Sequence, residues 1–153
     1  MVAGVHLATI HDVRWAKDKN GSLLSKPNGD KALEIIFKDK DGYSINSIFW
    51  LSSNTKWCLD SLCKAIGVDN TSRTPDVKEV IGKKLFVAVA NEYRMFDGKR
   101  QLNDSGEEIY YPKLLMKFFP VTDPNKHPVI EGDPKYNGGE CGGMFLIEKQ
   151  VHE

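Results

Sequence analysis

Long hydrophobic runs are missing from this sequence. No apolar stretch approaches the roughly 20 residues that a transmembrane helix needs, so we expect no membrane partner. Residues 1–10 are too short and too interrupted, by Gly4 and His6, for a secretory signal peptide. Cysteine is scarce, and the three cysteines are an odd number, which argues against a disulfide framework. We therefore expect a reduced protein of the cytoplasm.

The chain also lacks net charge. Its 21 basic and 21 acidic side chains cancel, whereas a strong non-specific nucleic-acid binder usually has a basic excess. Basic residues outnumber acidic ones within residues 1–40, and the reverse holds within residues 121–153, which permits a basic face on a neutral molecule. Hydrophobic residues make up 41% and charged residues 27% of the 153 positions, which suits one globular domain.

Motifs that carry catalysis are missing as well. The chain has no Gly-x-Ser-x-Gly turn for a nucleophilic serine, and no histidine adjoins a cysteine. Cys58 and Cys63 have no second Cys/His pair to complete a zinc site, so we expect them in a helix core. Residues 138–143 are glycine-rich but lack the Lys-Ser/Thr pair of a phosphate loop. We predict no catalytic residues, no metal site, no cofactor and no enzymatic activity.

What the sequence does contain is the two-residue alternation of β-strands. Strands are predicted over residues 5–13, 32–37, 43–51, 84–93 and 109–121. Apolar residues at helical spacing predict one helix over residues 54–66, which starts at a Ser53 or Asn54 cap and ends at Gly67. The predicted buried face of this helix consists of Leu59, Leu62 and Ile66.

Alternation also assigns side chains to faces. In the first strand, Leu7, Thr9 and Val13 share one face. In the third strand, the apolar face consists of Tyr43, Ile45, Phe49 and Leu51. Trp50 is therefore predicted to point outward.

The order of these elements predicts the fold. Three strands, a helix and two strands is the order of the OB-fold, a small, partly open barrel. We predict a mainly β protein whose residues 1–121 form a five-stranded OB-like barrel with one helix between strands 3 and 4. Residues 122–153 are a Gly/Pro-rich C-terminal extension with room for one extra strand at 144–147.

Basic residues alternate with aromatic ones in the two loops that bind ligands in OB-folds. Lys19 and Lys26 add charge to the first of these loops. The predicted phosphate contacts are Arg14, Lys17, Arg94, Lys99 and Arg100. The predicted stacking rings are Trp15, Trp50, Tyr93 and Phe96.

Three stretches of the chain resemble the phage and prophage single-stranded DNA-binding proteins of OB type. They are Ala32–Phe37 continuing to Tyr43–Leu51, the segment Trp57–Gly67, and Gly82–Val89. The resemblance implies binding of single-stranded DNA without strong sequence preference, in DNA replication or recombination. It implies replication or recombination proteins as further partners and, for a phage-encoded protein, the host cytoplasm.

Two other classes of function stay open. A structural or protein-interaction barrel would show an exposed apolar patch and no basic groove, and a homo-oligomer would fit that reading. An uncharacterised hydrolase would need acidic residues and histidines gathered around a metal in a pocket.

Overall fold

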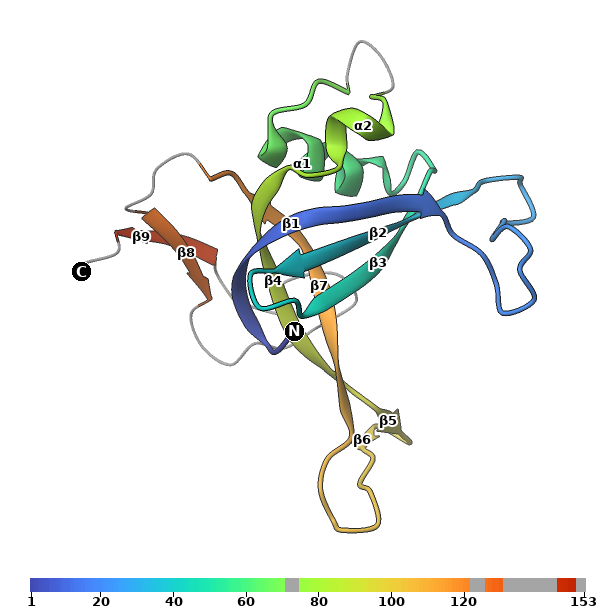
Figure 1. Cartoon of the computed structure of the whole chain (residues 1–153). Helices are drawn as coiled ribbons and strands as arrows, with labels where there is room; N and C mark the ends of the chain where they lie inside the picture. Colours follow the sequence, from blue (N-terminus) through green and yellow to red (C-terminus); the bar gives the residue numbers. More distant parts are fainter. Residues whose placement is uncertain (71–74, 122–125, 131–145, 151–153) are drawn as a thin grey trace.

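Five long antiparallel strands form the body of the protein (Figure 1). The computed structural model describes residues 1–70, 75–121, 126–130 and 146–150. The strands are β1 (Gly4–Trp15), β2 (Ala32–Asp39), β3 (Ser44–Trp50), β4 (Lys84–Tyr93) and β7 (Tyr110–Phe119). They are hydrogen-bonded in the order β3-β2-β1-β4-β7. The mainly β prediction is confirmed, and each of these strands overlaps one predicted from the alternation.

The sheet curls so that its two edge strands come together. Phe118 on β7 lies 6.1 Å from Phe49 on β3 and 6.0 Å from Phe37 on β2, measured between ring centroids. In the part of the chain that the structure describes, no hydrogen-bonded ladder joins β3 to β7. The five strands of the predicted OB-like barrel therefore form a curled sheet that does not close.

A bulge in β1 helps to bend the sheet. Ile10 pairs with Phe37 and Asp12 pairs with Ile36, so His11 is an extra residue on β1. An extra residue increases local twist and reverses the alternation beyond it. Val13 consequently packs against the core together with Ile10, and the predicted shared face of Val13 with Leu7 is wrong.

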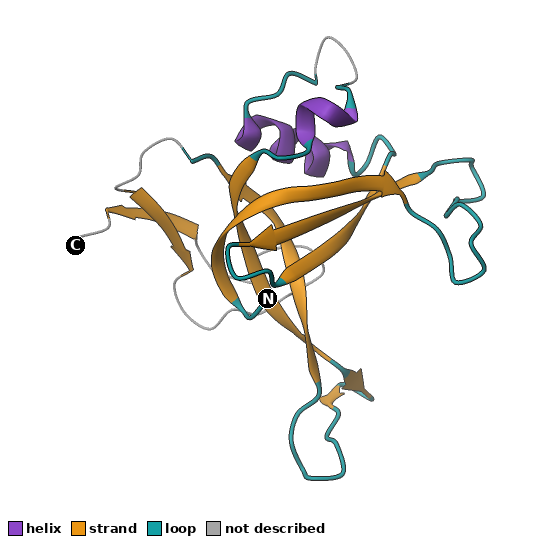
Figure 2. Ribbon diagram, in the orientation of Figure 1, coloured by secondary structure: helices purple, strands orange, loops and turns teal. Residues whose placement is uncertain are grey.

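Helix α1 (Lys56–Ile66) covers one end of the sheet (Figure 2). Leu62 is fully buried in the core cluster, and Leu59 and Ile66 pack against that cluster, as predicted. Gly67 ends the helix with φ +75°. The cap prediction was wrong: Thr55 precedes the helix, and its hydroxyl donates instead to the Trp50 carbonyl at 2.8 Å, which ties the helix start to β3.

Shorter elements complete the chain. They are the one-turn helix α2 (Val77–Val80), the hairpin strands β5 (Met95–Phe96) and β6 (Lys99–Arg100), and the paired strands β8 (Lys126–Ile130) and β9 (Leu146–Gln150). Strand β8 lies against β1. Of the predicted extra strand, Met144 and Phe145 lie outside the described residues, and β9 begins at Leu146. Within the described residues, the helices are too short to cross a membrane.

Replacing Leu62 tests the packing of α1 on the sheet. Leu62→Ala should lower the free energy of unfolding by roughly 2–5 kcal/mol, because a fully buried leucine leaves a cavity when truncated. Leu23→Ala is the matched control, since Leu23 is 44% exposed in a loop and should lose far less. Urea denaturation of both variants measures the difference. Equal, small losses would contradict the packing described here.

Candidate nucleic-acid interface

Three turns of the same design close the loops of the sheet. In each, the side-chain oxygen of an Asp or Asn accepts two backbone N–H groups, at 2.8–3.0 Å, and the fourth residue is a glycine with φ between +80° and +85°. The turns span residues 18–22, 39–43 and 103–107. Such side-chain bonds satisfy backbone donors locally, and the positive φ suits glycine. Both candidate ligand loops are therefore ordered by their own sequence.

The β1–β2 loop places a cation on a tryptophan. Lys26 Nζ lies 4.9 Å from the centroid of the Trp50 ring, within cation–π range. Trp50 pairs with Ala32 on β2, and its neighbour Phe49 points into the core, so Trp50 lies on the outer face as predicted. Lys17 is exposed in the same loop, beside its bridge partner Leu23.

Arg14 lies on the outer face of the sheet, where a carboxylate holds it. Its Nε donates to Glu34 Oε1 at 2.6 Å, and Asn46 Nδ2 donates to Glu34 Oε2 at 3.1 Å. The three side chains connect β1, β2 and β3. Glu34 is mostly buried, whereas Arg14 is more than half exposed, so the guanidinium is oriented but still open to solvent.

Trp15 lies on the opposite face from Trp50. It pairs with Leu33, which packs against the core, and it is 51% exposed. Its ring borders an apolar pocket of about 330 Å³ between the sheet and the two helices, with Leu59 and Val80 among the lining residues. The structure therefore does not bring Trp15 together with Trp50.

The predicted polar connection between the last two long strands is an ordered hairpin arm. We define the arm as residues 91–112. Within the arm, the β5–β6 hairpin has its tip at Asp97-Gly98, which have φ values of +54° and +76°, as in the tight turns that favour Asp-Gly. Phe96 and Lys99 are paired across this tip, and Phe96 is 75% exposed. The Asp97-Gly98 pair is itself a hairpin signal in the sequence.

The arm gathers five of the predicted residues, Tyr93, Arg94, Phe96, Lys99 and Arg100. Arg100 Cζ lies 3.7 Å from the centroid of the Tyr93 ring, and Arg100 Nη1 donates to Glu108 Oε2 at 2.8 Å. Arg94 is exposed beside Tyr93 in a shallow, open pocket. Phe96 lies at the tip.

Sequence reasoning missed two tyrosines on the returning strand. Tyr110 and Tyr111 are 53% and 56% exposed and pair with Tyr93 and Glu92. The adjacent Tyr-Tyr pair, within the strand predicted over residues 109–121, was the signal for them. They extend the aromatic surface of the arm onto β7.

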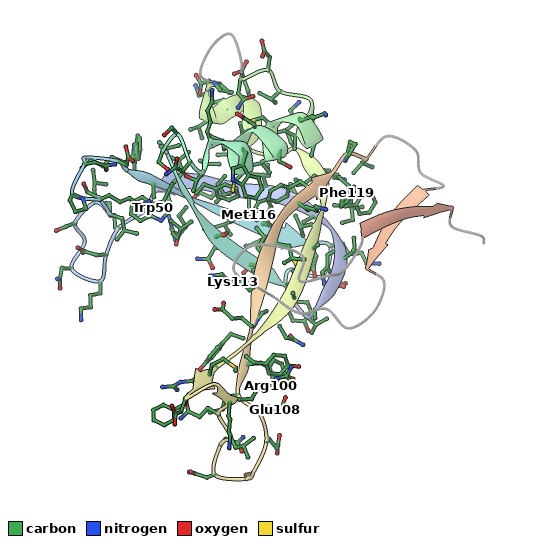
Figure 3. All side chains as sticks on the ribbon, turned by 180° about the vertical axis from the view of Figure 1, so that it is seen from behind. Trp50, Arg100, Glu108, Lys113, Met116 and Phe119 are labelled. Carbon is green, nitrogen blue, oxygen red and sulfur yellow. The ribbon has the colours of Figure 1, made fainter. Side chains whose placement is uncertain are left out.

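The Lys26–Trp50 pair and the arm lie at two ends of one side of the molecule. In Figure 3, Lys113 on β7 is seen between Trp50 and Arg100. The arm projects from the end of the sheet opposite the helices, and the β1–β2 loop projects separately (Figure 2).

The described residues were also compared with the predicted absence of a metal site. No group of three His, Cys, Asp or Glu side chains is arranged to hold a metal in residues 1–70 and 75–121. Cys58 and Cys63 are buried free thiols, and burial raises the pKa of each. Cys141 lies outside the described residues. No family model and no curated protein matches the sequence.

The buried thiols should react slowly in the folded protein. The thiolate is the reactive form, and a raised pKa lowers its fraction at any given pH. In a Cys141→Ser variant at pH 8, Ellman's reagent should modify Cys58 and Cys63 much more slowly than free cysteine, and at the free rate once urea unfolds the chain. Rapid modification of the native variant would contradict the described burial.

Proposed function

We propose that this chain is an OB-like protein that binds single-stranded DNA without strong sequence preference, in DNA replication or recombination. The proposed partners are single-stranded DNA and proteins of those processes, in the cytoplasm. The strand order β3-β2-β1-β4-β7, the helix between β3 and β4, and the contact between Phe49 and Phe118 support an OB-like architecture.

The observation that carries the proposal is the pairing of cations with aromatic rings in two loops on either side of β3 and β7. In the β1–β2 loop, Lys26 lies over Trp50. In the arm, Arg100 lies over Tyr93, with Phe96 and Lys99 at the tip. Single strands are bound by this chemistry, since cations follow the phosphates while rings stack on unpaired bases.

Each predicted residue keeps a role in the proposal. The phosphate contacts are Arg14, Lys17, Arg94, Lys99 and Arg100, and the stacking rings are Trp15, Trp50, Tyr93 and Phe96. Tyr110 and Tyr111 join the rings because they are exposed on the same arm. Trp15 would require a strand that wraps around the edge of the sheet, since it lies on the other face from Trp50.

A protein-interaction module is the second candidate. The arm supports it, because its exposed apolar and aromatic side chains form the kind of surface that partners bury. These side chains are Met95, Phe96, Leu102, Tyr110 and Tyr111. Sedimentation velocity at rising concentration would detect self-association of the chain through the arm.

Titration of the protein with labelled oligothymidine at two salt concentrations tests the proposal. Trp50 fluorescence should be quenched as bases stack, and affinity should fall steeply with salt because phosphate contacts release counterions. Absence of binding at low salt and micromolar protein would reject single-strand binding and favour the interaction module.

Substitutions of two paired residues of the β5–β6 hairpin distinguish the contribution of stacking to binding from that of charge. Phe96→Ala should weaken oligothymidine binding by about 1–3 kcal/mol without changing the salt dependence, because it removes a ring and no charge. Lys99→Ala should flatten the log–log salt slope by about 0.7, the contribution of one phosphate contact on a single strand. Both side chains are exposed, so thermal unfolding should not change.

Matched controls lie on α1. Trp57→Ala removes a 53% exposed ring, and Lys64→Ala removes an exposed cation, from an element that contributes to neither loop. Both variants should bind as the wild type does. If they lost as much affinity as Phe96→Ala and Lys99→Ala, the interface would not be the one proposed.

A further inference from the structure

Arg100 covers a ring that was predicted to stack on a base. Its Cζ atom lies 3.7 Å from the centroid of the Tyr93 ring, well within cation–π range. Tyr110 lies 5.5 Å from the same ring, tilted by 53°. A nucleobase cannot stack on the face of Tyr93 that Arg100 occupies.

The guanidinium is held in this place from two sides. Glu108 Oε2 accepts from Arg100 Nη1 at 2.8 Å, and Arg100 Cζ lies against the Tyr93 ring. The Asn103 turn, in which Asn103 Oδ1 accepts from Glu107 N–H at 2.9 Å, orders the segment that carries Glu108. Arg100 is therefore arranged before any ligand arrives.

Three backbone hydrogen bonds form a ring at the base of the β5–β6 hairpin. Arg94 N–H donates to the Ile109 carbonyl, Ile109 N–H to the Gln101 carbonyl, and Gln101 N–H to the Arg94 carbonyl, at 2.8–3.0 Å. Tyr93, Arg100 and Tyr110 are the chain neighbours of these three residues. These three side chains therefore extend from backbone that is held by a closed ring of hydrogen bonds.

We propose that Arg100 is a base-stacking platform, rather than a phosphate contact, within the proposed single-strand interface. The inference rests on the proposed function and corrects the roles given there to Arg100 and Tyr93. Tyr93 supports the guanidinium, and the opposite face of the guanidinium takes an unpaired nucleobase.

The chemistry of the group favours a base over a phosphate. Glu108 already balances the charge of Arg100, which weakens its attraction for an anion. The guanidinium plane is weakly hydrated and stacks on aromatic faces, and unpaired bases are known to stack on such planes. About a third of the Arg100 side chain remains exposed, 35%, so the site is open to a ligand. Bases inside a duplex are already stacked, so the platform selects single strands.

Arg100→Lys separates the two roles because it keeps the charge and removes the plane. The ligands are labelled oligothymidine and an abasic oligomer with the same number of phosphates, and fluorescence anisotropy measures both affinities. A platform predicts that Arg100→Lys binds oligothymidine about 5- to 150-fold more weakly, the effect of one stacked base. It also predicts an unchanged salt slope, and equal affinity of the variant and the wild type for the abasic oligomer.

Other outcomes overturn the platform. If Arg100→Lys binds oligothymidine as the wild type does, or loses equal affinity for both oligomers, Arg100 does not stack on a base. Lys64→Arg on α1, with its exposed side chain, is the matched control and should bind both oligomers as the wild type does. Circular dichroism of Arg100→Lys should show the wild-type unfolding temperature, since the side chain lies outside the core.

The test distinguishes failure of the platform from failure of the function. Wild-type protein that does not bind oligothymidine at low salt rejects single-strand binding as a whole. Wild-type protein that binds, together with an Arg100→Lys variant that binds equally well, rejects only the role given to Arg100.

Discussion

The contact of Phe118 with Phe37 and Phe49 is the constraint on which the arrangement of the surface depends. These rings belong to β7, β2 and β3, and they meet only because the sheet curls through its bulges. Burial of large aromatic rings contributes strongly to core stability. The same contact brings β3 beside β7, so that the β1–β2 loop and the arm flank one surface. Core packing thus positions the side chains that we assign to the ligand.

Loop order follows from local chemistry rather than from the core. The turns at residues 18–22, 39–43 and 103–107 each close on an Asp or Asn side chain and a glycine with positive φ. Because the backbone donors of these turns are satisfied within five residues, exposed loops keep a defined shape without burying apolar surface. The entropy of ordering the loops is therefore largely lost on folding rather than on ligand binding.

The elements were predictable where the apolar pattern was uninterrupted, as in β4, whose bounds match the prediction and whose residues 85–90 are all buried. They were not predictable where one residue breaks the period. Nothing in the sequence around His11 marks it as an extra residue, yet this bulge moves Val13 to the core face. The outward placement of Trp50 followed from its neighbours, whereas the opposite face of Trp15 depends on that same bulge.

The details of the candidate site were beyond sequence reasoning for a different reason. Arg100 and Glu108 are near in sequence, but their contact with Tyr93 depends on backbone bonds that join three separate segments at Arg94, Gln101 and Ile109. The residue types of Tyr93 and Arg100 predicted an aromatic ring and a cation in this loop. They did not predict that the two side chains lie against each other. The contact between the two residues covers one face of the Tyr93 ring, and this contact decides which surface is left for a base in the proposed interface.

Within the proposed interface, as in the chain as a whole, negative side chains offset positive ones. Arg14 is paired with Glu34, Arg100 with Glu108, and Lys113 on β7 with Glu92 at 4.0 Å. Exposed ion pairs such as those of Arg100 and Lys113 contribute little to folding stability. The paired carboxylates lower the positive potential that a phosphate would meet, and with it the number of counterions released on binding. In the interface that we propose, stacked bases therefore supply much of the affinity, while the remaining phosphate contacts give the binding its salt dependence.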